Sequence, residues 1–144
     1  MTKGELAYKL FKDGNNCSQA VALAFKDEMN LSEDLIKKLI IGFGGGFGRQ
    51  RLVCGAVSGM TMVLSYIKSD GSDKTAIYSI LQKACDEVKK ELGSLICAEL
   101  LDSSDAVKTS PIAEERTEEY YKKRPCADIC RIVADITYKY LKET

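Results

Sequence analysis

The chain contains no histidine and no tryptophan, and only two of its 144 residues are proline. The absence of histidine excludes a Ser-His-Asp triad, a Cys-His pair and any zinc site with imidazole ligands. A metal in this protein would therefore need cysteine, carboxylate or backbone ligands. General acid–base chemistry would fall to Glu, Asp, Lys, Tyr or Cys side chains.

The chain also lacks an excess of charge of either sign. Lys+Arg and Asp+Glu each number 21, which gives a formal net charge of zero. Nucleic-acid-binding proteins need a basic surface, and proteins held at a membrane by charge need a basic cluster. The longest apolar stretch, residues 52–67, is interrupted by Ser58, Thr61 and Ser65 and is shorter than the ~20 residues of a membrane span. We therefore expect no nucleic-acid partner and no membrane partner.

The bulk composition is that of a globular protein. Hydrophobic residues make up 45% and charged residues 29%, and 144 residues suit a single domain, 1–144. The first residues lack the pattern of a signal peptide, which favours the cytoplasm. In that compartment six cysteines indicate metal binding or redox chemistry more than structural disulfides. The sequence leaves open whether the chain forms a homo-oligomer.

Helical periodicity runs through almost every long segment, and no segment alternates as strands joined by hairpin turns would. We predict an all-α fold, a bundle of about six to seven helices with a glycine-rich loop at 42–48. The charged run 114–124 is expected to be a solvated helix face with Glu118–Lys122 and Glu119–Lys123 pairs. An irregular connection, which could act as a lid, is expected at 102–109. The expected helices are 3–12, 17–29, from Ser32 towards Gly42, 53–68, from Ser72 or Asp73 to Leu92, a turn or two from Cys97, one opening at Ser110-Pro111, and one from Cys126 to Leu141. Asn16 is expected to cap the second of these, and Gly93 to end the helix at Leu92.

The six cysteines fall into two classes by position. Cys85 and Cys130 lie within apolar helical stripes and are predicted to be buried packing residues. The other four each follow turn-forming or capping residues, at the predicted start of a helix. They are Cys17, Cys54, Cys97 and Cys126. A helix N-terminus favours the thiolate, so these four are the candidate redox thiols or metal ligands.

The glycine-rich loop immediately precedes Cys54. Glycine allows a positive φ and a close backbone approach, so we predict that Gly44, Gly45 and Gly46 form part of the site and aim N–H groups at sulfur. Gly55 and Gly59 share one helical face, which allows either tight helix packing or room for a bound group beside Cys54. The loop also carries arginines, which could bind an anion, offset thiolate charge or lie on the surface. They are Arg49 and Arg51.

These motifs match a known family. The matching segments are Asn16-Cys17-Ser18-Gln19-Ala20-Val21, the glycine run at 42–46, Cys54-Gly55-Ala56-Val57-Ser58-Gly59, and Cys126 at the head of the last helix. Over essentially its whole length the chain resembles the C_GCAxxG_C_C family of redox-active proteins. The resemblance implies a redox role and places the four characteristic cysteines at Cys17, Cys54, Cys97 and Cys126, with Cys130 as an alternative for the last.

A four-cysteine site supports three interpretations. The four thiolates could hold an iron–sulfur cluster or another metal, zinc included, and exchange electrons with a redox partner protein. Without a metal, pairs such as Cys17 and Cys54 could cycle between dithiol and disulfide. Alternatively, the chain could be a non-catalytic helical interaction module whose cysteines only pack. We favour the first, with the cluster ahead of zinc.

Overall fold

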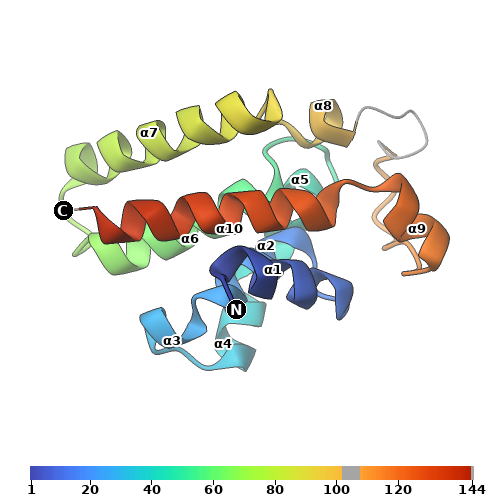
Figure 1. Ribbon diagram of the computed structural model, residues 1–144, viewed down its shortest axis with the longest axis horizontal. Coiled ribbons are helices and arrows are strands. Elements are labelled where there is room, and N and C mark those ends of the chain that lie inside the picture. The colour runs from blue at the N-terminus through green and yellow to red at the C-terminus, as the bar shows by residue number, and fades with distance from the viewer. Residues whose placement is uncertain (102–107, 144) are drawn as a thin grey trace.

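The computed structural model describes residues 1–101 and 108–143. Its regular elements are helices, so the predicted all-α, single-domain fold is confirmed (Figure 1). Most of the connection predicted at 102–109 lies outside the described residues. The helices are α1 (Lys3–Lys12), α2 (Cys17–Ala24), α3 (Lys26–Met29), α4 (Glu33–Ile40), the 3₁₀ turn η1 (Ile41–Phe43), α5 (Gly44–Phe47), α6 (Gly55–Lys68), α7 (Lys74–Leu92), α8 (Cys97–Leu101), α9 (Glu118–Lys123) and α10 (Cys126–Lys142).

Helix α2 forms the centre of the core, and its residues 18–24 are all buried. Helices α1, α6 and α10 pack around it, and α7 lies alongside α10 (Figure 1). The crossing of α1 and α10 is close because Gly4 lacks a side chain. A Cβ on Gly4 would lie 2.6 Å from the Arg131 carbonyl oxygen. The Gly4 N–H also donates to the Asp135 carboxylate at 2.8 Å, which fixes this contact.

The start of α2 is fixed by hydrogen bonds, and this start carries Cys17. As predicted, Asn16 caps the helix, and it forms a capping box with Gln19. The Asn16 amide also donates to the Ile41 carbonyl at 3.0 Å, and the Ser18 hydroxyl donates to the Ile40 carbonyl at 2.8 Å. The first turn of α2 is therefore tied to the end of α4.

Gly55 and Gly59 let α6 approach α2 closely. A Cβ on Gly59 would lie 2.8 Å from the Ser18 carbonyl oxygen. A Cβ on Gly55 would lie 3.0 Å from the Phe43 carbonyl oxygen and 3.2 Å from the Cys17 Cβ. Tight helix packing thus explains both glycines. It also brings the N-terminus of α6, and with it Cys54, next to Cys17.

The helix predicted from Ser110-Pro111 is wrong, because residues 110–117 are irregular. Helix α9 begins later, where Thr117 caps it by accepting from the Tyr120 N–H at 3.1 Å. The predicted helix 17–29 is divided at the fully buried Phe25, which separates α2 from α3. Within the described residues, no helix combines the length and apolar character needed to cross a membrane.

Candidate functional site

The glycine-rich loop carries an unusual run of left-handed backbone. Gly45 and Gly46 have φ values of 66° and 73°, and the non-glycine residues Phe47, Arg49 and Arg51 have φ values of 70°, 65° and 62°. A non-glycine residue held in this region costs on the order of 1–3 kcal/mol. Backbone hydrogen bonds hold the loop, from Arg51 N to Gly45 O at 3.1 Å and from Leu52 N to Gly46 O at 2.9 Å. The strain is concentrated in the segment that leads into Cys54.

A short backbone bridge joins Cys54 to Cys97. Val53 and Ile96 form an isolated antiparallel β-bridge. The Cys54 N–H donates to the Leu95 carbonyl at 2.8 Å, and the Cys97 N–H donates to the Leu52 carbonyl at 2.6 Å. These bonds hold the starts of α6 and α8 together, although the two helices are separated in sequence by the whole of α7.

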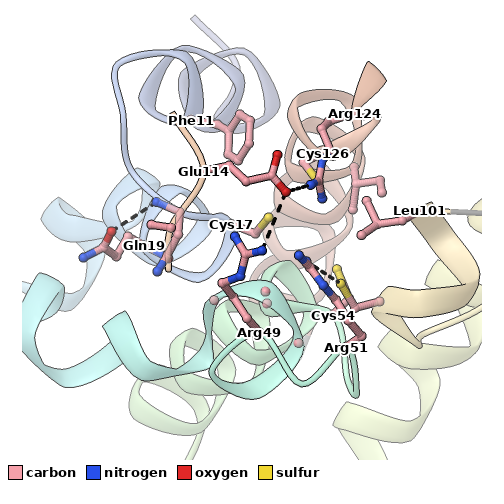
Figure 2. Close-up of a pocket in the computed structure, with 18 of the residues that line it drawn as sticks. Phe11, Cys17, Gln19, Arg49, Arg51, Cys54, Leu101, Glu114, Arg124 and Cys126 are labelled. Atoms are coloured by element: carbon pink, nitrogen blue, oxygen red, sulfur yellow. Dashed lines mark hydrogen bonds and ion pairs between the residues drawn. The ribbon is translucent and has the colours of Figure 1, made fainter. Parts of the chain in front are cut away.

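The four cysteines singled out from the sequence all lie at helix N-termini and line one cavity. Cys17, Cys97 and Cys126 are the first residues of α2, α8 and α10, and Cys54 directly precedes α6. The cavity has a volume of about 620 Å³. Gly44, Gly45, Gly46 and Gly55 also line it. Figure 2 shows Cys17, Cys54 and Cys126 around this space, with the glycine loop below them.

A fifth cysteine, Cys130, lies behind Cys17. The Cys17 thiol interacts with both Cys126 and Cys130, and the Cys130 Sγ lies 3.9 Å from the Cys17 carbonyl oxygen. Cys130 is fully buried, as predicted for a packing residue, and it does not line the cavity, but it contacts Cys17, which does. The sequence feature that indicates this position is the spacing of four residues between Cys126 and Cys130, which puts both side chains on one helix face. We call Cys17, Cys54, Cys97, Cys126 and Cys130 the cysteine group.

Cys85 lies apart from the cysteine group. It sits within α7, is half-buried against the core and does not line the cavity. The charged groups that act on its thiol are those of its own helix, Lys89 and Asp86. Cys85 therefore serves as an internal reference for a thiol outside the cavity.

Burial makes the thiol the favoured form of Cys54. Desolvation raises the pKa of Cys54 to about 12, against the lowering effect of the Ala56 and Val57 backbone N–H groups. No side-chain hydrogen bond caps α6 at this position. The N–H groups that favour the Cys54 thiolate thus belong to the first turn of α6. The predicted donors, Gly44 to Gly46, make no hydrogen bond to sulfur in the described structure. These glycines form the wall of the cavity instead.

The other cavity thiols are also shifted towards the protonated form. The contact with Cys17, and then burial, raises the pKa of Cys126 well above its usual value. The Cys126 contact lowers the pKa of Cys17, but Cys130 and burial together raise it further, so the net shift is upward. Burial raises the pKa of Cys97 against the effect of Arg51, whose Nη1 donates to the Cys97 Sγ at 3.7 Å.

The described residues that line the cavity include four arginines and one carboxylate, that of Glu114. Glu114 lies between Arg124, with which it forms a short ion pair, and Arg49, whose Nη2 is 3.6 Å away (Figure 2). Arg116 donates to the carbonyls of Phe11 and Asn15, both at 2.9 Å, and its guanidinium lies 4.2 Å from the Phe11 ring centroid. The fourth is Arg51.

Part of this wall comes from the run 114–124. The prediction of a solvated helix face is confirmed for α9, whose charged residues are exposed, and is wrong for residues 114–117, which are irregular, and for Arg124, which is buried. Arg124 is only 8% exposed, and Arg116 is covered by aromatic rings, so both turn inward. The Glu119–Lys123 pair of the exposed α9 face is present at 3.2 Å. Glu114, Arg116 and Arg124 are therefore site residues that the sequence reasoning missed, since alternating charge gave no sign that guanidinium groups would stack on Phe11 and Tyr120.

Comparison with known families gives a match to residues 15–140 of the chain. The matching family is described as "Putative redox-active protein (C_GCAxxG_C_C)". The chain belongs to this family. The resemblance seen in the sequence is confirmed, and it assigns the chain to redox-active proteins. Neither the curated proteins nor the solved structures that were compared contain a match.

In this member of the C_GCAxxG_C_C family, the cysteine group does not form a ready site for a single metal ion. Within residues 1–101 and 108–143, no set of three or more Cys, Asp or Glu side chains is close enough to hold one ion. Zn–S bonds of ~2.3 Å with tetrahedral angles would require sulfur atoms ~3.8 Å apart. The ligand sulfurs of an iron–sulfur cluster are separated by the iron and sulfide atoms, and all four can be cysteine thiolates. Four cysteines line the cavity, which is the number of thiolates that hold such a cluster.

Proposed function

We propose that this protein is a redox protein in which Cys17, Cys54, Cys97 and Cys126 hold an iron–sulfur cluster and pass electrons to a partner protein. The observation that carries the proposal is that these four cysteines, each from the start of a different helix, line one cavity. Such a cluster supplies one-electron transfer when it is bound. The proposal places the protein in the cytoplasm, where thiols stay reduced.

Three of the four ligands would be supported as thiolates by charged groups or backbone N–H groups of this chain. The first-turn N–H groups of α6 lower the pKa of Cys54, and the Arg51 guanidinium does so for Cys97. Arg124 and Arg116 act in the same direction on Cys126. Positive charge and N–H dipoles around sulfur stabilise a centre of net negative charge. The burial of Cys54, Cys97 and Cys126 keeps water away from it.

The raised pKa values argue against rapid thiol–disulfide exchange. With a pKa of about 12, Cys54 would be a thiolate in roughly one molecule in 10⁵ at about pH 7, against roughly 3% for an ordinary thiol with a pKa of about 8.5. A more basic thiolate is a better nucleophile, which raises the rate of attack about 25- to 60-fold. This offsets only part of the roughly 3000-fold smaller population of thiolate. Exchange by Cys54 should therefore be about a hundredfold slower than by an exposed thiol. Metal binding overcomes the same shift by releasing the proton.

Thiol–disulfide exchange is a second candidate because of two contacts made by Cys17. The Cys17 thiol interacts with Cys126 and with Cys130, so Cys17 could form a disulfide with either. The balanced reaction would oxidise two thiols to one disulfide and reduce a disulfide of a partner protein to two thiols, with the protons transferred to the products. This candidate requires no metal.

The experiment is to purify the protein without oxygen and to measure its iron, its acid-labile sulfide and its absorption spectrum. We expect iron and sulfide in comparable amounts and visible charge-transfer bands that bleach on reduction. Cys54→Ser should lose both, whereas the matched control Cys85→Ser should keep them. A metal-free protein that forms a Cys17 disulfide would replace the proposal by thiol exchange. Metal-free protein with unreactive thiols would instead support a helical interaction module.

A further inference from the structure

The Arg49 side chain has unsatisfied hydrogen-bond donors inside the cavity. The side chain is only 16% exposed, and its one ion pair, with Glu114, is 3.6 Å long. Within the described residues its guanidinium makes no hydrogen bond, and the buried Nε has no partner at all. An arginine carries five N–H donors, and a buried donor without an acceptor is destabilising. The Arg49 guanidinium is therefore a positively charged group at the cavity with donors that can bind an anionic acceptor.

The backbone of the glycine-rich loop fixes the position of the Arg49 side chain. Arg49 itself has a φ of 65°, in the left-handed region that non-glycine residues avoid. Its side chain folds over Gly45, where an added Cβ would lie 2.7 Å from the Arg49 Cγ. Backbone strain of this kind persists where the surrounding structure enforces it, and it gathers at ligand sites. An arginine with only a surface role would need neither the strained backbone nor the glycine beneath it.

The neighbouring arginines differ because their donors are engaged by the protein. Arg51 donates to the Lys108 carbonyl at 3.0 Å and to the Cys97 sulfur. Arg116 donates to two backbone carbonyls, and Arg124 is paired with Glu114. Figure 2 shows Arg49 and Arg51 pointing from the loop into the cavity, with Glu114 facing Arg49 from the opposite wall. Arg49 is thus the cavity arginine whose guanidinium makes no hydrogen bond within the described residues; its Nε is buried, so an incoming anion would meet the Nη groups first.

We propose that Arg49 binds the carboxylate or phosphate group of a small anionic molecule that enters the cavity beside the cysteine group. A guanidinium fork matches the paired oxygens of either group. The Glu114 carboxylate, 36% exposed and on an irregular segment, lies where such a group would bind and competes with it. The rest of the molecule would reach towards Cys17 and Cys54. This site does not depend on which metal, if any, the cysteines hold.

The test observes the Arg49 side chain directly during titration with two probes, sodium acetate and inorganic phosphate. The anaerobically purified protein is labelled with ¹⁵N, and the arginine Nε–Hε signals are followed at constant ionic strength set by chloride. Arg49→Lys, which keeps the charge but removes Nε, identifies the Arg49 signal. We expect that signal to move saturably with at least one probe, and the better probe indicates whether the natural ligand carries a carboxylate or a phosphate. A signal that responds saturably to neither probe overturns the proposal.

Three variants complete the test. Arg49→Gln should weaken binding of the better probe by roughly tenfold or more, as expected for loss of a charge-assisted hydrogen bond. Glu114→Gln should strengthen it, because the competing carboxylate is gone. Arg131→Gln is the matched control, since Arg131 lies on α10 outside the cavity and is 44% exposed. Iron and sulfide content of Arg49→Gln should equal that of the parent protein. If Arg49→Gln loses the metal but binds the probe as before, Arg49 serves the cysteines and the anion site is refuted.

Discussion

Gly46 lies directly against Cys97: a Cβ atom on Gly46 would be 2.7 Å from the Cys97 Cβ. The same Cβ would be 2.7 Å from the Leu52 nitrogen and 2.8 Å from the Arg51 Cα, both in the backbone that leads to Cys54. The loop glycine therefore packs between Cys97 and the backbone that leads to Cys54. This contact gives Gly46 a role that does not depend on donating a hydrogen bond to sulfur.

We expect Gly46→Ala to damage the cysteine site more than the fold. The new methyl group must displace Cys97 or the loop backbone, and it adds strain at a φ of 73°. Gly71→Ala is the matched control, because Gly71 also has a positive φ, 89°, but no atom within 4 Å of an added Cβ. Gly71→Ala should lose about 1 kcal/mol of unfolding free energy from backbone strain, measured in urea. Gly46→Ala should lose this and roughly 1–3 kcal/mol more from the displaced Cys97 and loop backbone. Only Gly46→Ala should lose iron and sulfide, and equal metal content in the two variants would contradict the role given to the Gly46 contact.

The helix starts could be predicted from the sequence because their signals are local. Asn16 before Cys17 and Gly93 at the end of α7 act within one turn of the chain, and the structure has both where they were expected. The false start at Ser110-Pro111 followed the same local rule. There the structure leaves the segment irregular, and its side chains contribute to the cavity wall. Tertiary contacts outweighed a weak helix preference.

The assembly of the site could not be predicted in the same way. The bridge between Val53 and Ile96, which joins Cys54 to Cys97, is a single pair with no strand pattern on either side. The inward turn of Arg116 depends on aromatic faces from α1 and α9, which are far apart in sequence. Position at helix starts predicted the four cysteines that line the cavity. Cys130 joins the cysteine group because it packs against Cys17, which the sequence did not indicate.

The choice between Cys126 and Cys130 as the fourth ligand can be made by paired substitution. Cys126 lines the cavity, whereas Cys130 lies behind Cys17 and is fully buried. Cys126→Ala should lose iron and sulfide. Cys130→Ala should retain them at a cost of about 1 kcal/mol in unfolding free energy, typical of a small core truncation. The reverse pattern of metal content would move the ligand to Cys130.

The stability of the metal-free protein should fall as the pH rises above about 9, the usual pKa of its thiols. A raised pKa means that the folded state keeps a proton which the unfolded state releases. The stabilisation is therefore complete below the unfolded pKa, and it is lost progressively as the pH rises towards about 12 for Cys54. Urea unfolding at about pH 7.5 and about pH 9.5 tests this, since most tyrosine ionisation lies higher.

Substitution isolates the contribution of Cys54 to this pH dependence. Cys54→Ala should reduce the loss of unfolding free energy between these two pH values by roughly 0.8 kcal/mol. Cys85→Ala should reduce it less, because Cys85 is only half-buried and its thiol is also near Lys89. A pH dependence left unchanged by Cys54→Ala would mean that the folded protein holds this thiol no more tightly protonated than the unfolded chain.

Arg51 should set both the acidity of Cys97 and the potential of any centre bound there. Its Nη1 donates to the Cys97 Sγ at 3.7 Å, and this guanidinium lowers the pKa of Cys97 against the effect of burial. Arg51→Gln removes the charge, so alkylation of Cys97 in the metal-free protein should slow. In the metal-bound protein the reduced state, which carries the additional negative charge, loses more stabilisation than the oxidised state. The midpoint potential should therefore fall, by at most roughly 60–120 mV, the equivalent of a whole charged hydrogen bond in a one-electron step. Arg51→Lys should restore part of both effects, and Arg131→Gln should produce neither. If alkylation rate and potential are both unchanged in Arg51→Gln, the Arg51–Cys97 contact has no influence on the chemistry of the site.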